Sequence, residues 1–281
     1  MSKNNWEIGI SCNPYKERMK PVFEHCQRAG VGAIEISFLY NMCGYDCAKN
    51  IFDTTDFSEL KKLSEGTGVK LWSYHLPFDH GEVNIASLDK KVREQTIALD
   101  SAMIEKSAEY GIGMIVIHPS GEPIDDKDRA DSMKCAKEGI LKLNETAKKC
   151  GVTLAVENLP RTCLGNVGLE IMDIVKLDDS LAVCFDVNHL LMQSHKDFVE
   201  AVGDRIKTVH ISDYDFVNER HFAPGQGKID WKELLELLHK VNYKGPFMNE
   251  VKDIVFDWEK TPDNLTYSEL KKINDELLAK Y

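Results

Sequence analysis

The chain has 281 residues, 43% of them hydrophobic, which is enough for one large globular domain. Its formal net charge of −11 disfavours nucleic acid as a partner, and no stretch rich in lysine and arginine offsets that charge. No apolar stretch approaches the roughly 20 residues that span a bilayer, and the N-terminus lacks the apolar core of a signal peptide. We therefore expect a cytoplasmic protein with neither nucleic-acid nor membrane partners.

Short apolar runs, often β-branched, alternate with longer amphipathic segments. In chain order, we expect strands at residues 8–12, 33–38, 70–77, 113–119, 153–160, 181–188, 206–213 and 246–251. Helices are expected between them, for example at residues 89–110, 128–150 and 230–241, where apolar residues recur at helical spacing. This alternation is typical of βαβ units and a parallel sheet.

Eight strand–helix repeats in a chain of this length predict an α/β protein with a closed (β/α)8 TIM barrel. A doubly wound open sheet is the alternative, but its G-x-G-x-x-G motif is missing after the first expected strand. No linker rich in proline, glycine or serine interrupts the series. We therefore expect a single domain over residues 1–281.

The eight cysteines are scattered along the chain without a CxxC motif, and Cys43 and Cys47 are the closest pair. The chain is also far larger than the domains that disulfides usually staple. We expect all eight to be reduced thiols, most of them packed in the core.

Every expected strand except the first ends in an ionisable residue. In a barrel these ends point to one shared mouth, where active sites are built. A single histidine at such a position is more often a hydrogen-bonded rim residue than a ligand, but converging carboxylates repel one another without a cation. The strand-end residues are Glu35, His75, His118, Glu157, Asp186, His189, His210, Asp213 and Glu250.

The best set of metal ligands comprises Glu157, Asp186, His210 and Glu250, one from each of the last four strands. Three carboxylates and one imidazole suit a single divalent ion such as Mn²⁺, Mg²⁺ or Co²⁺ and tolerate Zn²⁺. Such a site suits proton abstraction beside a carbonyl, because the ion stabilises an enediolate. Glu157 and Glu250 could flank a bound sugar as its acid/base pair.

Other polar residues near the strand ends are candidates for substrate contact. His75 and His118 are expected to be free to meet substrate, and Glu35 could bind substrate hydroxyls. Arg161 could bind a substrate phosphate or pair with an acid at the rim. Asp213 and Asp215 fit loop or supporting roles better than metal ligation.

The remaining histidines and aromatic residues near the expected strands give weaker signals. The aromatic residues Phe78, Trp72 and Tyr214 could form an apolar wall for a sugar. His25, His195 and His239 fall in helical segments and are expected to pack or to face solvent, and His80 is left undecided.

Four segments resemble the xylose isomerase-like TIM-barrel superfamily, in particular its sugar-phosphate isomerase/epimerase branch. They are LAVENLPRT (154–162), CFDVNH (184–189), VHISDYDFVNERHFAPGQGKIDW (209–231) and MNEV (248–251). The likeness covers nearly the whole chain, and residues 209–231 are its most specific part. It implies the same four metal ligands, the two glutamates as acid/base pair, and contact of His189 and His221 with substrate oxygens.

The resemblance thus implies an isomerase of sugars or sugar phosphates that uses one divalent metal ion and could form a homo-oligomer. The residues leave open which sugar it takes, whether that sugar is phosphorylated, and which carbon changes. A related dehydratase or lyase of polyols or keto-sugars would begin with the same proton abstraction. A protein that only binds metal or sugar would not need two acids on opposite faces of the substrate.

Endonuclease IV, a three-metal DNA-repair enzyme, belongs to the same superfamily and supplies another alternative. Its nine ligands would fall on His75, His118, Glu157, Asp186, His189, His210, Glu219, His221 and Glu250. The match departs at Glu219, where the repair enzyme carries aspartate. The charge of −11 also disfavours a groove for DNA.

Overall fold

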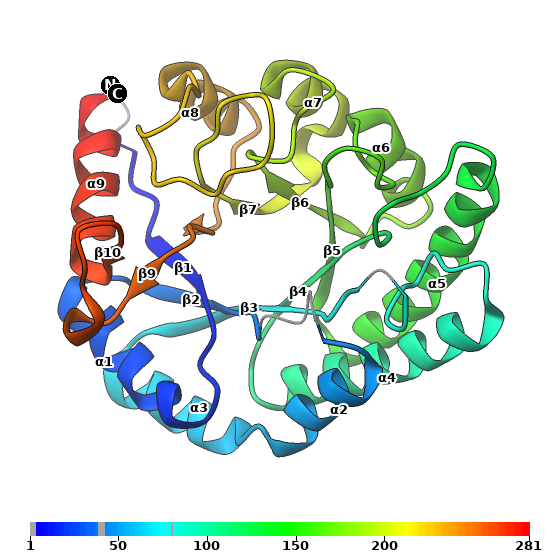
Figure 1. Cartoon of the computed structure of the whole chain (residues 1–281), viewed down its shortest axis with the longest axis horizontal. Helices are drawn as coiled ribbons and strands as arrows, with labels where there is room; N and C mark the ends of the chain where they lie inside the picture. Colours follow the sequence, from blue (N-terminus) through cyan, green and yellow to red (C-terminus); the bar gives the residue numbers. More distant parts are fainter. Residues whose placement is uncertain (1–3, 39–42, 80) are drawn as a thin grey trace.

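A computed structural model describes residues 4–38, 43–79 and 81–281. Eight parallel strands lie inside a ring of helices (Figure 1). The strands are β1 (Ile8–Cys12), β2 (Ala33–Ile36), β3 (Lys70–His75), β4 (Met114–Ile117), β5 (Thr153–Glu157), β6 (Ala182–Asp186), β7 (Ile206–His210) and β8 (Phe247–Asn249). The prediction of a TIM barrel is confirmed, and His80 lies outside the described residues.

The strands pair in the order β7-β6-β5-β4-β3-β2-β1-β8. The remaining gap, between β7 and β8, is bridged just past the strand ends. There the Ile211 amide donates to the Met248 carbonyl (2.7 Å), and the Glu250 amide donates to the Ile211 carbonyl (3.0 Å). This bridge nearly closes the barrel and brings Glu250 beside the end of β7.

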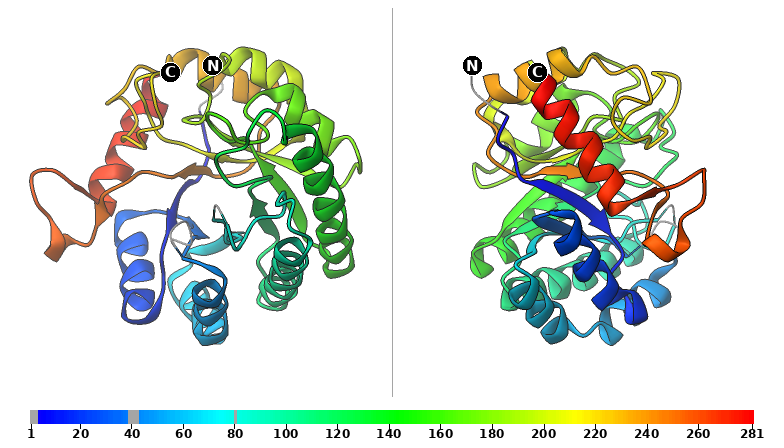
Figure 2. Two further views of the ribbon diagram at one scale, coloured as in Figure 1. Left: turned by 45° about the vertical axis from the view of Figure 1, so that its right-hand side comes forward. Right: turned by 90° about the vertical axis from the view of Figure 1, so that its left-hand side faces the viewer.

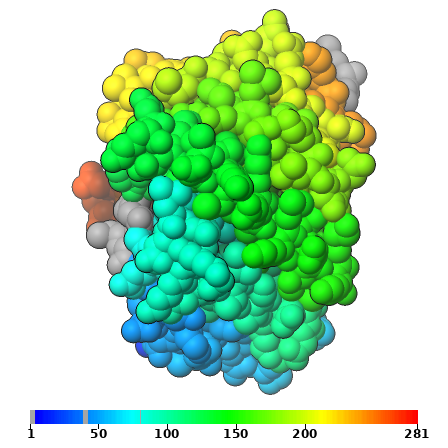
Figure 3. All heavy atoms as spheres, turned by 90° about the vertical axis from the view of Figure 1, so that its right-hand side faces the viewer, coloured from blue at the N-terminus to red at the C-terminus, as the bar shows by residue number. Residues whose placement is uncertain are grey.

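The helices of the outer layer are α1 (Met19–Ala29), α2 (Tyr45–Thr54), α3 (Phe57–Thr67), α4 (Lys90–Glu109), α5 (Arg129–Cys150), α6 (Gly168–Val175), α7 (His195–Val202), α8 (Trp231–Lys240) and α9 (Tyr267–Lys280). Seen from the side of α5, the middle of the chain forms the outer surface (Figure 3). A two-stranded ladder, β9 (Ile254–Val255) with β10 (Leu265–Thr266), precedes α9.

Local sequence explains where the helices begin and end. Helix α8 is typical, because the Asp230 side chain accepts from the Glu233 amide and satisfies a free donor of its first turn. The leucines of α8 then bury one face against the barrel. Helix α5 ends at Gly151, whose φ of +71° is a left-handed conformation that glycine adopts without strain.

The expectation of eight free thiols is wrong for Cys43 and Cys47, which form a disulfide at the start of α2. Their Cα atoms lie 5.5 Å apart, within the range that a disulfide spans, because Cys47 lies in the first turn of the helix. The other six cysteines are free, and Cys26, Cys163 and Cys184 are buried as expected.

The histidines expected in helices behave as packing residues or lie near the surface. His25 and His195 are buried, and His195 Nε2 donates to the Val187 carbonyl (2.8 Å). His239 stacks on Trp6 at a ring distance of 4.5 Å. None of the three lies at the carboxyl ends of the strands.

Candidate functional site

The carboxyl ends of the strands open into a cavity of about 440 Å³. This is within the range of small-molecule sites. It lies at the end of the barrel toward which β1 points in the right-hand view of Figure 2. Four carboxylates line it, together with three histidines and an apolar wall formed by Phe78, Leu159, Pro160 and Cys163. Most of the candidate residues therefore do meet in one place.

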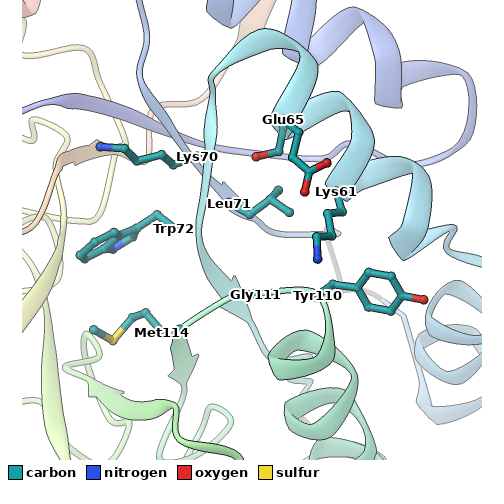
Figure 4. A pocket seen from close by; sticks show the side chains of 10 residues that line it. Lys61, Glu65, Lys70, Leu71, Trp72, Tyr110, Gly111 and Met114 are labelled. Carbon is teal, nitrogen blue, oxygen red and sulfur yellow. The ribbon is translucent and has the colours of Figure 1, made fainter.

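A second cavity, of about 520 Å³, lies at the opposite end of the barrel (Figure 4). Its lining includes Lys70 and Met114, the first residues of β3 and β4. Trp72 belongs to this end, because it lines that cavity and its Nε1 donates to Thr208 Oγ1 (3.2 Å). Its expected role in a sugar wall is therefore wrong, whereas Phe78 does line the first cavity.

Glu157, Asp186, His210 and Glu250 converge at the base of the first cavity. Nδ1 of His210 lies 3.1 Å from Glu157 Oε1, 3.1 Å from Glu250 Oε2 and 3.8 Å from Asp186 Oδ2. The candidate ligand atoms of the four residues all lie within 4.8 Å of one another. We call these four residues the carboxylate–histidine group.

The carboxylate–histidine group fits a divalent cation. Asp186 Oδ2 and Glu250 Oε2 are buried atoms for which the described residues supply no hydrogen-bond donor. Burial, together with the nearby carboxylates of Glu250 and Glu157, raises the pKa of Asp186 to about 7. Buried, mutually repelling carboxylate oxygens that lack donors are what a metal ion would satisfy.

Asn158 explains why the apolar run of β5 ends in two polar residues. Its side chain accepts from the Asp186 amide (2.9 Å) and donates to the Asp186 carbonyl (2.9 Å). Glu157 contributes its carboxylate to the carboxylate–histidine group. Asn158 holds the end of β6 beside the end of β5 through its two hydrogen bonds. Asp186 is thus held by a neighbouring strand, which preorganises its carboxylate.

Glu35 supports His210 rather than lining the cavity. It is fully buried, accepts a hydrogen bond from Ser73 Oγ (2.7 Å), and lies 3.0 Å from Nε2 of His210. A carboxylate behind the ring favours the tautomer that leaves Nδ1 free to bind a metal. The expectation that Glu35 could bind substrate hydroxyls does not fit this burial.

His75 and His118 form a second group with Glu157. Nδ1 of His75 donates to the Leu76 carbonyl (2.9 Å), and its Nε2 lies 3.1 Å from Glu157 Oε2. Nε2 of His118 lies 3.3 Å from the same oxygen, and Phe78 stacks on the His118 ring at 3.7 Å. Burial opposes ionisation of Glu157, but the imidazoles of His210 and His118 hold its pKa well below the usual range.

His189, Glu219 and His221 form a third group at the rim. Nε2 of His189 lies 3.3 Å from Glu219 Oε2, while its Nδ1 donates to the Asn158 carbonyl (3.0 Å). Nδ1 of His221 donates to the Glu250 carbonyl (3.0 Å). Burial alone would lower the pKa of His189, but Asp186 and Glu219 raise it to about 10.

Arg161 spans the rim between two acids. Its Nε and Nη2 donate to the two oxygens of Glu122 (2.7 and 2.6 Å), and Nη2 also donates to Glu219 (2.9 Å). Of the two roles left open for this arginine, the structure shows the pairing with rim acids. Glu122 was not predicted as a site residue, because it lies in the loop after β4 without a recognisable motif.

Asp213 fixes the loop that follows β7. Its carboxylate accepts from the amides of Tyr214, Gly225 and Ile229 and from Trp231 Nε1. Tyr214 is buried and its hydroxyl donates to the Leu190 carbonyl, so its expected part in a sugar wall is also wrong. Asp215 caps amides of the same loop, which fits the supporting role expected for both aspartates.

The model of one protein family matches residues 23–272 and is described as xylose isomerase-like TIM barrel. The chain belongs to this family. The match covers most of the chain, so it includes every residue of the three groups.

Two curated relatives illustrate the range of similarity. The uncharacterized protein MJ1311 of Methanocaldococcus jannaschii is 29% identical over 189 residues, or 64% of each chain, slightly less than two thirds. D-psicose 3-epimerase of Ruminiclostridium cellulolyticum is 25% identical over 210 residues, covering 71% of this chain and 69% of the relative. Such epimerases are isomerases of sugars.

Solved structures share the fold over nearly the full length. A D-tagatose 3-epimerase-like protein superposes with a TM-score of 0.77 at 23% identity, covering 97% of both chains. The IOLI protein, described with a binding zinc atom, gives a TM-score of 0.74 at 19% identity over 97% of this chain and 98% of that one. Among the described residues of the present chain, no helix is long and apolar enough to cross a membrane.

Proposed function

We propose that this chain is a divalent-metal-dependent epimerase or isomerase of ketoses that removes a proton next to the substrate carbonyl. The observation that carries the proposal is the carboxylate–histidine group, two of whose carboxylates are glutamates at the base of a sugar-sized cavity. A hard, oxygen-rich set of this kind suits Mn²⁺, Mg²⁺, Co²⁺ or Zn²⁺. When bound there, the ion would act as a Lewis acid toward the carbonyl.

Glu157 and Glu250 take the roles of metal ligand and acid/base. Burial opposes ionisation of Glu250, but the imidazoles of His210 and His221 keep its pKa below the usual range, so that the side chain is a carboxylate able to bind a cation. Its side chain is 30% exposed, whereas that of Glu157 is 1% exposed. One glutamate removes the proton from one face of the substrate, giving an enediolate, and the other returns a proton from the opposite face.

The rim residues orient the sugar. His118, His189 and His221 line the cavity, and we assign them to contact with substrate oxygens. His75 is buried with both ring nitrogens engaged, so the expectation that it meets substrate does not fit its position. Arg161 uses four of its five guanidinium N–H groups for other residues and keeps one for a hydroxyl. The named epimerase relative, which acts on D-psicose, supports a ketose as the substrate class.

Exchange with solvent tests the proposal. In D₂O, the metal-loaded protein is expected to exchange one carbon-bound proton of a ketose from a panel of D-psicose, D-tagatose, D-fructose and L-ribulose, followed by NMR. A chelator should stop the exchange. Analysis of the products separates an epimer or aldose from the dehydrated product of a dehydratase or lyase. Failure of every ketose to exchange would count against the proposal.

A second candidate function is hydrolysis of a phosphate ester at three metal ions, as in endonuclease IV. The observation that favours it is the orientation of three histidines. Nδ1 of His75, His189 and His221 each donates to a backbone carbonyl, as metal-binding histidines commonly do. Three features favour the sugar enzyme instead. Position 219 is a glutamate where the repair enzyme carries aspartate, Arg161 is paired with carboxylates at the rim, and the net charge of the chain is −11. Cleavage of abasic DNA would support the nuclease.

A further inference from the structure

We propose that the substrate is an uncharged ketose, because Arg161, the single lysine or arginine among the described residues that line the cavity, is already paired with two carboxylates. This inference rests on the proposed function and narrows its substrate class. Among the described residues that line the cavity, Arg161 is the only lysine or arginine. Residues 39–42 and 80, outside the described part, carry no lysine or arginine in the sequence either.

Most N–H groups of Arg161 already donate to other residues. Four of the five N–H groups of its guanidinium are used, by the two oxygens of Glu122, by Glu219 and by Asn218 Oδ1 (3.0 Å). The pairing with Glu122 is the two-point, fork-like arrangement that makes arginine–carboxylate pairs strong and directional. A phosphate would compete for the same donors, whereas a hydroxyl needs only the N–H that remains.

The neighbouring His189 also has partners of its own, so it offers no free donor to a phosphate. His189 uses Nδ1 for the Asn158 carbonyl and directs Nε2 to Glu219, 3.3 Å away. The same cavity is lined by the carboxylates of Glu122, Glu157, Glu219 and Glu250. A phosphate dianion entering it would meet carboxylates without an available counter-charge from a lysine or arginine, which disfavours its binding.

Matched pairs of substrates test the inference. The metal-loaded protein is assayed for exchange with free ketoses and with the corresponding phosphates, for example L-ribulose and L-ribulose 5-phosphate. We expect kcat/KM to be on the order of 10²-fold higher for the free sugar, because the charge of a bound phosphate group would lack partners in the cavity. Glu122→Gln keeps the shape but removes one of the two carboxylates that pair with Arg161, and it should narrow the ratio of the two kcat/KM values about tenfold. Glu236→Gln, an exposed change on α8, should leave the ratio as it is.

A binding measurement keeps this inference separate from the proposed function. Glycerol 3-phosphate is titrated into the metal-loaded wild type and Arg161→Ala, with calorimetric detection. Equal, weak binding to both proteins supports the inference. A wild-type preference for the phosphorylated ketose, or binding that Arg161→Ala weakens more than about tenfold, would overturn it. If no ketose of either kind exchanges, the proposed function fails, while this titration still decides whether Arg161 receives phosphate.

Discussion

Replacing Glu250 by glutamine is expected to lower the rate of ketose exchange in D₂O by about 10²–10⁴-fold, the range that a positioned acid/base group contributes. Glutamine keeps an oxygen that still coordinates weakly, but it removes the base. The carboxylate of Glu250 lies 3.1 Å from His210 Nδ1 and is the more exposed of the two glutamates, so the change leaves the buried Glu157 in place.

Metal content must be measured on the same samples, because a glutamate that is also a ligand can lose activity by losing the ion. Glu236→Gln serves again as the matched control, since it changes an exposed carboxylate on α8. Should Glu250→Gln bind its full metal and turn over substrate at the wild-type rate, the mechanism with two glutamates would be wrong.

Asp213→Ala is expected to reduce the free energy of unfolding by about 3–5 kcal/mol, because it leaves several buried donors without a partner. The side chain is buried and accepts from three backbone amides and from Trp231 Nε1. Together these bonds hold the loop that carries Glu219 and His221 against the barrel. The urea concentration at half-unfolding measures the loss.

Asp215→Ala is the matched control for this change. Asp215 belongs to the same loop and accepts from the amides of Val217 and Asn218, but its side chain is partly exposed and water can replace it. We expect Asp215→Ala to shift the urea midpoint much less than Asp213→Ala does. Equal stability losses in the two variants would contradict the account that the hydrogen bonds of the buried Asp213 hold this loop in place.

The barrel could be predicted because buried parallel strands are continuous apolar runs in the sequence. Each expected strand contains the observed one, although the ends differ. Residues 246–251, for example, contain β8 at Phe247–Asn249, because the chain leaves the ladder where Glu250 turns to the cavity. The convergence of Glu157, Asp186, His210 and Glu250 followed from the same rule, since parallel strands end at one edge of the sheet.

The partners of Arg161 could not be predicted in this way. Glu122 and Glu219 come from the loops after β4 and β7, 39 and 58 residues away in sequence, and loop conformations have no periodic signal. Trp72 shows another limit of the pattern. It lies on an expected strand, yet it faces the amino end of the barrel, because its position along the strand, and not its residue type, decides which end it lines.

Titration of the metal-free protein with Mn²⁺ tests the central claim most directly, with the rate of ketose exchange in D₂O as the readout. The carboxylate–histidine group predicts that exchange appears with the first ion and saturates at about one equivalent per chain. Exchange that requires about three equivalents, or abasic-DNA cleavage without exchange on any ketose, would contradict a sugar enzyme with one metal site and favour the three-metal hydrolase.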